Sequence, residues 1–263
     1  MARLNPPSGI VTVSGLPWRG VCYFCTSRAG GVSAGPLGTL NLAQHVHDEP
    51  SCVVENRSRL GDRLPGEPLW LNQVHGASVF DADVDNGAIG GPPVADAAVT
   101  TRVDRVLAIM TADCLPIVIA ATDGLVLGVA HAGWRGLAGG VLEQTLARLR
   151  AAHPHPAHAQ WHAWVGPAIS QRHFEVGADV FSAFVDRDGL SRVFFAEKIP
   201  NRKWLADLPG LARHRLYQLG VADIELSGYC TYGQPDFFYS YRRDPLCGRM
   251  ATIAWLSGVD ADK

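Results

Sequence analysis

Two nearly continuous apolar runs near the middle of the chain constrain its fold more than any other feature. The first, VLAIMTADCLPIVIAA, spans residues 106–121, and the second, GLVLGVAH, spans residues 124–131. Runs of this kind are typical of fully buried strands. Asp113 and Cys114 interrupt the first run, and His131 ends the second, where Gly-rich sequence begins. A carboxylate, a thiol and an imidazole are therefore expected beside the core, at strand ends where folds place their chemistry.

A second imidazole has a similar setting. His75, in WLNQVHG, follows apolar residues and precedes a glycine. His75, Cys114 and His131 together form an incomplete tetrahedron for zinc, with the fourth position left for water or substrate. The alternative is structural, because a buried Cys often serves as a small apolar residue and a buried His as a hydrogen-bonded core group. Strand alternation points Asp113 away from Cys114, so we expect Asp113 to bond the backbone or support the site, not to bind a metal.

The segment AHAGWRGLAGG, residues 130–140, passes from apolar sequence through a Gly-rich turn into a helical pattern. Its glycines are Gly133, Gly136, Gly139 and Gly140. They would let backbone N–H groups approach an anion at a helix N-terminus, and Arg135 would add a fork for phosphate or carboxylate. The same glycines would also permit close packing of a helix on a sheet. The adjacent His131 favours the anion-binding interpretation.

Apolar runs that alternate with Gly and Pro predict many strands and few helices. The expected strands span residues 20–27, 68–76, 77–84, 95–101, 106–113, 115–121, 124–131, 160–166, 223–230, 237–243 and 250–256. Helices are expected at 137–152, 51–64, 177–188 and 203–220, the last broken at Pro209. We find no repeat and no linker, so the pattern predicts a mixed α/β class with residues 1–263 in one domain.

Composition narrows the function classes. The chain has 263 residues, of which 47% are hydrophobic, and a formal charge of −2 with both signs interspersed. Its pattern shows no basic stripe for nucleic-acid phosphates and no membrane-spanning run, and we expect no signal peptide, because the apolar stretch near residue 10 is short and rich in Pro and Gly. Six cysteines in such a length are too few for a disulfide framework. We expect a cytoplasmic protein that binds neither nucleic acid nor membrane and has no obligate protein partner.

Two further groups resemble metal sites but have simpler explanations. The histidines of AAHPHPAHAQWHAW are His153, His155, His158 and His162. The two prolines of this segment suggest an extended connector with solvent-facing side chains. Cys22 and Cys25 have the spacing of a redox or zinc pair, yet residues three apart on a strand face opposite sides.

Motifs spread over nearly the whole chain resemble those of the YfiH family of laccase-domain proteins, formerly called multicopper polyphenol oxidases and now described as purine nucleoside phosphorylases. In chain order they are TSRAGGVS (26–33), LNL (40–42), NR (56–57), LNQVHG (71–76), ADAAVT (95–100), TADCLPI (111–117), AHAGWRG (130–136), VGPAISQRHFEVG (165–177) and CTYGQPDFFYSYRRDPLCGRMATIAWL (230–256). One departure is that His173 and Phe174 stand where the family pattern has Cys and Tyr.

The resemblance implies a layered α/β/β/α fold with mixed sheets, and a catalytic zinc held by His75, Cys114 and His131. It also implies two kinds of chemistry. In the deaminase activity, zinc-activated water attacks C6 of adenine in adenosine and releases ammonia. In the phosphorylase activity, phosphate attacks the anomeric carbon of adenosine, inosine, guanosine or methylthioadenosine, which yields a ribose 1-phosphate and the free base. Purine nucleosides and phosphate are thus the implied partners, and copper is an alternative metal.

Phosphate binding calls for arginines. The motif segments offer Arg28, Arg135, Arg242, Arg243 and Arg249. Each has the alternative of a solvated surface charge or a structural salt bridge. Glu175 is a candidate proton carrier. Gln73, which precedes His75 by two residues on the same face of an expected strand, is a candidate for orienting water or substrate.

Three rival functions come from other classes. A copper-dependent polyphenol oxidase would need a trinuclear copper cluster held by paired His-x-His motifs. The two pairs in this chain, His45/His47 and His153/His155, lie in loop-like sequence, which argues against such a cluster. A cysteine hydrolase or amidase, for example on a peptidoglycan precursor, would use Cys114 as nucleophile and His131 as base, but would have no use for the imidazole of His75. A non-catalytic ligand-binding module would leave an open metal position unused.

Overall fold

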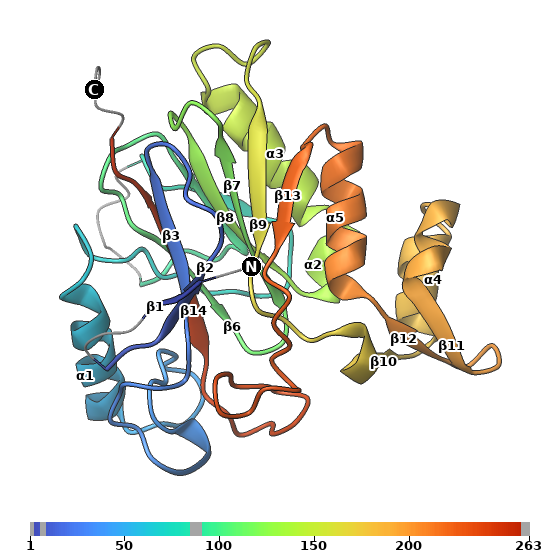
Figure 1. Ribbon diagram of the computed structural model, residues 1–263, viewed down its shortest axis with the longest axis horizontal. Helices are drawn as coiled ribbons and strands as arrows, with labels where there is room; N and C mark the ends of the chain where they lie inside the picture. Colours follow the sequence, from blue (N-terminus) through green and yellow to red (C-terminus); the bar gives the residue numbers. More distant parts are fainter. Residues whose placement is uncertain (1–2, 6–8, 85–90, 259–263) are drawn as a thin grey trace.

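Two sheets pack face to face and helices cover their outer sides, in the layer order α/β/β/α that the family resemblance implies (Figure 1). The computed structural model describes residues 3–5, 9–84 and 91–258. α1 (Pro50–Gly61) lies on one outer side, whereas α3 (Val141–Ala152) and α5 (Leu208–Gln218) lie on the other.

The larger sheet has six strands in the order β13-β9-β7-β8-β5-β4. Their bounds are β4 Val79–Asp81, β5 Ala97–Thr100, β7 Leu115–Ala121, β8 Leu127–Ala132, β9 Trp161–Val165 and β13 Asp223–Leu226. The outer pairs β13·β9 and β4·β5 are parallel and the inner pairs are antiparallel, so the sheet is mixed as expected.

The second sheet has five antiparallel strands in the order β1-β2-β3-β14-β6. Their bounds are β1 Arg3–Asn5, β2 Thr12–Ser14, β3 Val21–Thr26, β6 Leu107–Thr111 and β14 Met250–Leu256. Cys22 is partly exposed and Cys25 fully buried on β3, which confirms that the two thiols face opposite sides. All six cysteines are free.

The apolar run of β7 explains the position of this strand between two cores. Ile117 and Ile119 face the helix side and join the core cluster that contains Leu146 of α3. Val118 and Ala120 face the second sheet and join the cluster between the two sheets. Because each fully buried Ile or Leu stabilises the fold by about 1.5–3 kcal/mol, a run that is apolar on both faces fixes β7 inside the molecule.

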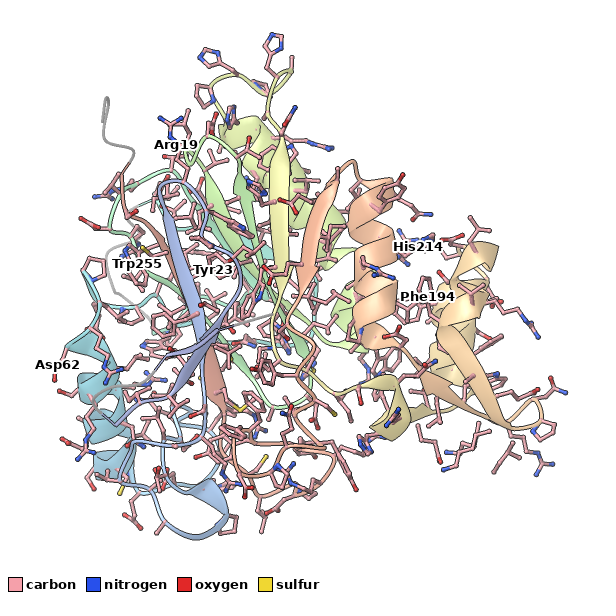
Figure 2. All side chains as sticks on the ribbon, in the orientation of Figure 1. Arg19, Tyr23, Asp62, Phe194, His214 and Trp255 are labelled. Atoms are coloured by element: carbon pink, nitrogen blue, oxygen red, sulfur yellow. The ribbon has the colours of Figure 1, made fainter. Side chains whose placement is uncertain are left out.

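A small third sheet, in the order β10-β12-β11, extends from one side of the molecule. Its strands are β10 Glu175–Val176, β11 Phe195–Ile199 and β12 Lys203–Ala206. Around it lie α4 (Ala178–Val185) and the 3-10 helices η2 (Gln171–His173) and η3 (Gly189–Phe194). Phe194 and His214, labelled in Figure 2, join this region to α5 with ring centroids 5.4 Å apart.

The helix expected over 203–220 is wrong in its first part. Residues 203–206 form β12, and α5 starts at Leu208 with Pro209 in its first turn. Proline fits there because the first N–H groups of a helix have no intrahelical partner, so Pro209 begins this helix and does not break it. The helix expected over 137–152 is also divided. α2 (Trp134–Gly139) precedes α3, and Gly140 between them is left-handed with φ +93°.

Two expected strands do not form. Residues 68–76 make only isolated bridges through Leu69 and Asn72. The side-chain amide of Gln73 there bonds the backbone of Met110 through both its oxygen and its nitrogen, each at 2.8 Å, in place of a backbone ladder. Residues 237–243 form turns, because Arg243 donates to the carbonyls of Thr231, Tyr232 and Phe238.

The four histidines before and on β9 divide in two, and the prediction that they face solvent is wrong for His153. His153 is buried and pairs with Asp123 at 2.8 Å, and His162 pairs with Asp223 at 2.5 Å. His155 and His158 are exposed, as a solvent-facing connector predicts. None of the helices in the described part of the chain is long and apolar enough to cross a membrane.

Candidate metal centre

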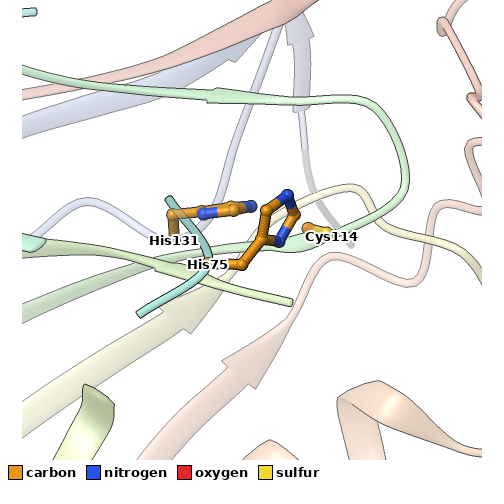
Figure 3. Close-up of side chains that lie close together, drawn as sticks. All are labelled: His75, Cys114 and His131. Carbon is orange, nitrogen blue, oxygen red and sulfur yellow. The ribbon is translucent and has the colours of Figure 1, made fainter. Parts of the chain in front are cut away.

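His75, Cys114 and His131 come together where the two packed sheets end (Figure 3). The three potential ligand atoms lie within 4.8 Å of one another. The two imidazole rings meet edge to face with centroids 4.7 Å apart. His131 is buried, Cys114 is partly buried and His75 is exposed, so the group opens to solvent on the His75 side.

Strand alternation points two of these side chains into the space between the sheets. His131 on β8 shares a face with Leu127 and Val129, which belong to the core between the sheets. Cys114 directly precedes β7, and the β7·β8 register pairs Pro116 with His131, so the thiol lies beside that imidazole. His75 comes from a loop and has φ +59°.

Asp96 holds two of the three residues in place, and sequence reasoning missed it. Its carboxylate is fully buried and lies 2.8 Å from Nδ1 of His131. It also accepts hydrogen bonds from the backbone N–H groups of Val74, His75 and Gly76, at 3.2, 2.9 and 2.6 Å. One carboxylate therefore ties the His75 loop to β8. The available signal was a lone acidic residue in the apolar stretch ADAAVT.

The same contacts set the protonation of the group. Because a carboxylate only accepts, Nδ1 of His131 carries a proton, so Nε2 is the nitrogen that can bind a metal once it has given up any proton of its own. Burial alone would raise the pKa of Cys114, but hydrogen bonds from His131 and His75 outweigh it and lower that pKa. Burial would lower the pKa of His131, but the bonds to Asp96 and Cys114 raise it. A thiolate is thus favoured, and a thiolate is the form of cysteine that binds metals.

Gly133 leaves the space that this group needs. A Cβ on Gly133 would lie 2.9 Å from Nδ1 of His75 and 3.0 Å from Sγ of Cys114. A Cβ on Gly136 would lie 2.8 Å from the carbonyl oxygen of Gly76. These two glycines of the turn at 130–140 therefore serve close packing of α2 against the His75 loop.

The donor set fits a metal ion. Two imidazoles and one thiolate at mutual distances below 4.8 Å leave one tetrahedral position open. The pairing of Asp96 with His131 is the carboxylate–histidine contact that commonly orients a metal-binding imidazole.

Comparison with known proteins identifies the family. The model of the family described as multi-copper polyphenol oxidoreductase laccase matches residues 22–257. The chain belongs to the YfiH family. This confirms the family expected from the sequence motifs.

Relatives of this YfiH-family chain carry a functional name. A Xylella fastidiosa protein named purine nucleoside phosphorylase is 45% identical over 260 residues, which cover 95% of this chain and 98% of that protein. The Escherichia coli purine nucleoside phosphorylase YfiH is 42% identical over 240 residues, or 90% of this chain and 95% of that protein. The crystal structure of a Neisseria meningitidis protein superposes with a TM-score of 0.84 at 40% identity and covers 95% of this chain and 99% of that one.

In this YfiH-family chain, the three candidate ligands open onto a cavity of about 400 Å³. Three of the five candidate arginines line it: Arg135, Arg242 and Arg249. Its aromatic wall residues are Trp134, Phe174 and Tyr241. Sequence reasoning assigned no role to these aromatic residues or to His45, which also lines the cavity.

The other two candidate arginines serve the fold. Arg28 donates from Nε to the carbonyl of Gly38 and from Nη1 to that of Pro235, both at 2.9 Å. Arg243 donates to three carbonyls in the C-terminal loop. Neither lines the cavity, because each guanidinium joins loop segments.

Glu175 and Gln73 are also committed elsewhere. Glu175 lies outside the cavity lining and forms ion pairs with Lys198 at 2.6 Å and Lys203 at 3.4 Å, which lower its pKa. Gln73 lines the cavity, but both atoms of its amide bond Met110. The geometry therefore supports neither Glu175 as proton carrier nor Gln73 as a group that orients substrate.

Asp113 has the supporting position that the sequence predicts. It stands at φ +98°, and its carboxylate accepts from the hydroxyl of Thr231 at 2.6 Å and from the backbone N–H of Arg242 at 2.7 Å. It thereby anchors the loop that carries Arg242 and Tyr241 over the cavity.

Proposed function

We propose that this YfiH-family chain is a zinc-dependent purine nucleoside phosphorylase of the cytoplasm, with adenosine deaminase and methylthioadenosine phosphorylase activity. The observation that carries the proposal is that the His75, Cys114 and His131 group and three arginines line one cavity. The relatives named purine nucleoside phosphorylase support the same reaction class. Six free cysteines agree with a reducing compartment.

Zinc bound by the three residues supplies a Lewis acid that lowers the pKa of water at its open position. The protein's part is to hold the ligands ready. Asp96 fixes the tautomer and the direction of the His131 ring, while Gly133 admits the His75 and Cys114 side chains at close range. Deamination of adenosine needs such an activated water, whereas phosphorolysis needs an anion site and a purine site.

The anion site is the group of cavity arginines. Arg242 uses Nη1 for the carbonyl of Glu175, and Arg249 uses Nη1 for the carbonyls of Cys247 and Gly248. Each keeps further N–H donors for a phosphate, and the backbone contacts hold the guanidinium groups in place. Arg135 is exposed and stacks on the ring of Trp134 at 4.4 Å, so it can reach an anion at the cavity mouth.

The purine site is the aromatic wall. Phe174 is buried and lies beneath the guanidinium of Arg242 at 5.3 Å from the ring centroid, while Trp134 and Tyr241 are partly or largely exposed. Flat apolar rings of this kind stack on purine bases. A cavity of about 400 Å³ lies in the range of small-molecule sites.

The experiment measures metal content and product formation together. Purified protein is expected to hold about one zinc ion per chain. It should convert adenosine to adenine only when phosphate is present, and it should convert adenosine to inosine in the absence of phosphate. Cys114→Ala should lose both the metal and the products, whereas Cys22→Ala, on β3 outside the cavity, should keep both. Wild-type protein that holds zinc but leaves every nucleoside intact would contradict the proposal.

A cysteine hydrolase or amidase is the second candidate, because Cys114, His131 and Asp96 form a hydrogen-bonded Cys-His-Asp series. His75 beside Cys114 favours the metal. Metal-free wild-type protein whose Cys114 reacts readily with iodoacetamide, and which leaves nucleosides intact, would support the hydrolase.

A multicopper oxidase has less support. Within the residues that the structure describes, the His75, Cys114 and His131 group is the one cluster of three or more candidate ligands. A multicopper site needs several such clusters, whereas replacement of zinc by a single copper ion remains compatible with this donor set.

A further inference from the structure

The cavity has one imidazole outside the candidate metal group. Departure of a purine requires a proton at the base, and Glu175 lies outside the cavity. Of the lining residues, His75, Cys114 and His131 form the candidate metal group, and both oxygens of Asp113 accept hydrogen bonds. Apart from the arginines, Tyr241 and His45 remain, and of these two His45 has an imidazole, whose ordinary pKa near neutrality suits both release and recovery of a proton.

Hydrogen bonds of a buried asparagine hold the loop that carries His45. It lies in the loop between β3 and α1, and the side chain of the fully buried Asn41 ties this loop together. Nδ2 of Asn41 donates to the carbonyl of Ala43 at 3.0 Å and to Oδ2 of Asp48 at 2.9 Å, so the segment that carries His45 is closed at both ends.

The same Asn41 places Arg249 beside His45. Oδ1 of Asn41 accepts from the N–H of Ala43 at 3.1 Å and from the N–H of Arg249 at 3.0 Å. One buried amide thus joins the His45 loop to the start of β14, although the two segments are about two hundred residues apart. His45 and Arg249 line the same cavity as a consequence.

The surroundings of His45 suit a group that gains a proton when an anion binds. His45 makes no hydrogen bond to any residue that the structure describes. Partial burial and the positive charges of Arg249 and Arg57 lower its pKa in the free protein. A phosphate bound at Arg249 would oppose that effect, because a nearby negative charge favours the protonated imidazole.

We propose that His45 carries the proton that the departing purine needs in phosphorolysis, an inference that rests on the phosphorylase function proposed above. An oxygen of hydrogen phosphate forms a bond to C1′ while the C1′–N9 bond breaks and its electron pair moves into the purine. The imidazolium of His45 gives its proton to N7 of the purine. The ribose 1-phosphate still carries the proton of the hydrogen phosphate, and that proton returns to His45.

The test compares two substrates, one of which needs this proton and one of which does not. Inosine must be protonated at the base as it leaves, whereas 7-methylinosine already carries a positive charge on that ring. The variant is His45→Asn, assayed as zinc-loaded protein with phosphate. The control is His47→Asn, because His47 lies two residues along the same loop, is exposed and does not line the cavity. His47 has φ +61°, a conformation that Asn tolerates.

His45→Asn is expected to lower kcat for inosine by about 10²- to 10⁴-fold, the range of general acid catalysis, and to lower it for 7-methylinosine by less than about tenfold. His47→Asn should match wild type on both. Equal losses on the two substrates, or full activity of His45→Asn on inosine, would overturn the role of His45 and leave the phosphorylase function standing. Wild-type protein that cleaves neither nucleoside would overturn both proposals.

Discussion

Replacing Asp96 by Asn tests how far one buried carboxylate organises the candidate metal centre. Oδ1 of Asp96 faces Nδ1 of His131 and the N–H of His75, and Oδ2 faces the N–H groups of Val74 and Gly76. An Asn side chain has a single acceptor oxygen. In either orientation, its NH₂ group points at two N–H donors, so the substitution removes two hydrogen bonds and the negative charge.

The size of the effect follows from these contacts. Hydrogen bonds to a charged group contribute about 1.5–3 kcal/mol each, so two lost bonds destabilise the fold by about 3–6 kcal/mol. Changes to a carboxylate that orients a metal-binding histidine weaken metal affinity by about 10- to 100-fold. We therefore expect a lower Tm of the metal-free protein and a zinc Kd raised by that factor.

The assay is competition for zinc against a chromophoric chelator, with thermal unfolding of the metal-free protein measured beside it. Asp123→Asn is the matched control, since Asp123 also pairs with a buried histidine, His153, at 2.8 Å but lies outside the cavity. Its zinc Kd should equal that of wild type. If Asp96→Asn binds zinc within about twofold of wild type, well below the 10-fold minimum expected for such a contact, the orienting role of Asp96 is refuted.

Three further outcomes are expected. Gly133→Ala should lose zinc, because its Cβ would crowd His75 and Cys114, whereas Gly139→Ala, with open space around it, should keep zinc; metal analysis compares the two. Removal of zinc by a chelator should abolish activity and expose Cys114 to iodoacetamide, as mass spectrometry would detect, and added zinc should restore both properties. Arg249→Met should raise the KM for phosphate by about tenfold, the effect of one lost charge-assisted bond, while Arg28→Met should leave that KM unchanged and lower Tm.

The strands that form the centre of the fold were predictable because nearly all of their residues are apolar. Every residue of β7 and β8 is buried, and short, nearly continuous apolar runs of this length are typical of strands covered on both faces. The strands that failed lack this property. Residues 68–76 and 237–243 contain apolar residues, but side-chain amide and guanidinium groups take over their hydrogen bonding. The sequence does not show such long-range replacement of a backbone ladder.

The candidate site was predictable to a similar degree. His75, Cys114 and His131 follow apolar runs, so their approach to one another could be expected from the strand ends. The arginines could not be sorted in the same way. Arg28 and Arg243 differ from two of the cavity arginines, Arg242 and Arg249, only in the loops that their guanidinium groups join. Such contacts are not visible in the sequence, because the partners, for example Arg28 and Pro235, are far apart along the chain.

The cavity lies between two sheets, and each sheet supplies a different part of the proposed site. The candidate metal ligands belong to the six-stranded sheet and to the loop that Asp96 ties to it. Arg249 directly precedes β14 of the five-stranded sheet, and His45 lies in the loop between β3 of that sheet and α1. If His45 and Arg249 act as proposed, substitutions on their side would alter substrate choice while the metal-binding side stays intact. The same metal centre would then be compatible with more than one anion or leaving group.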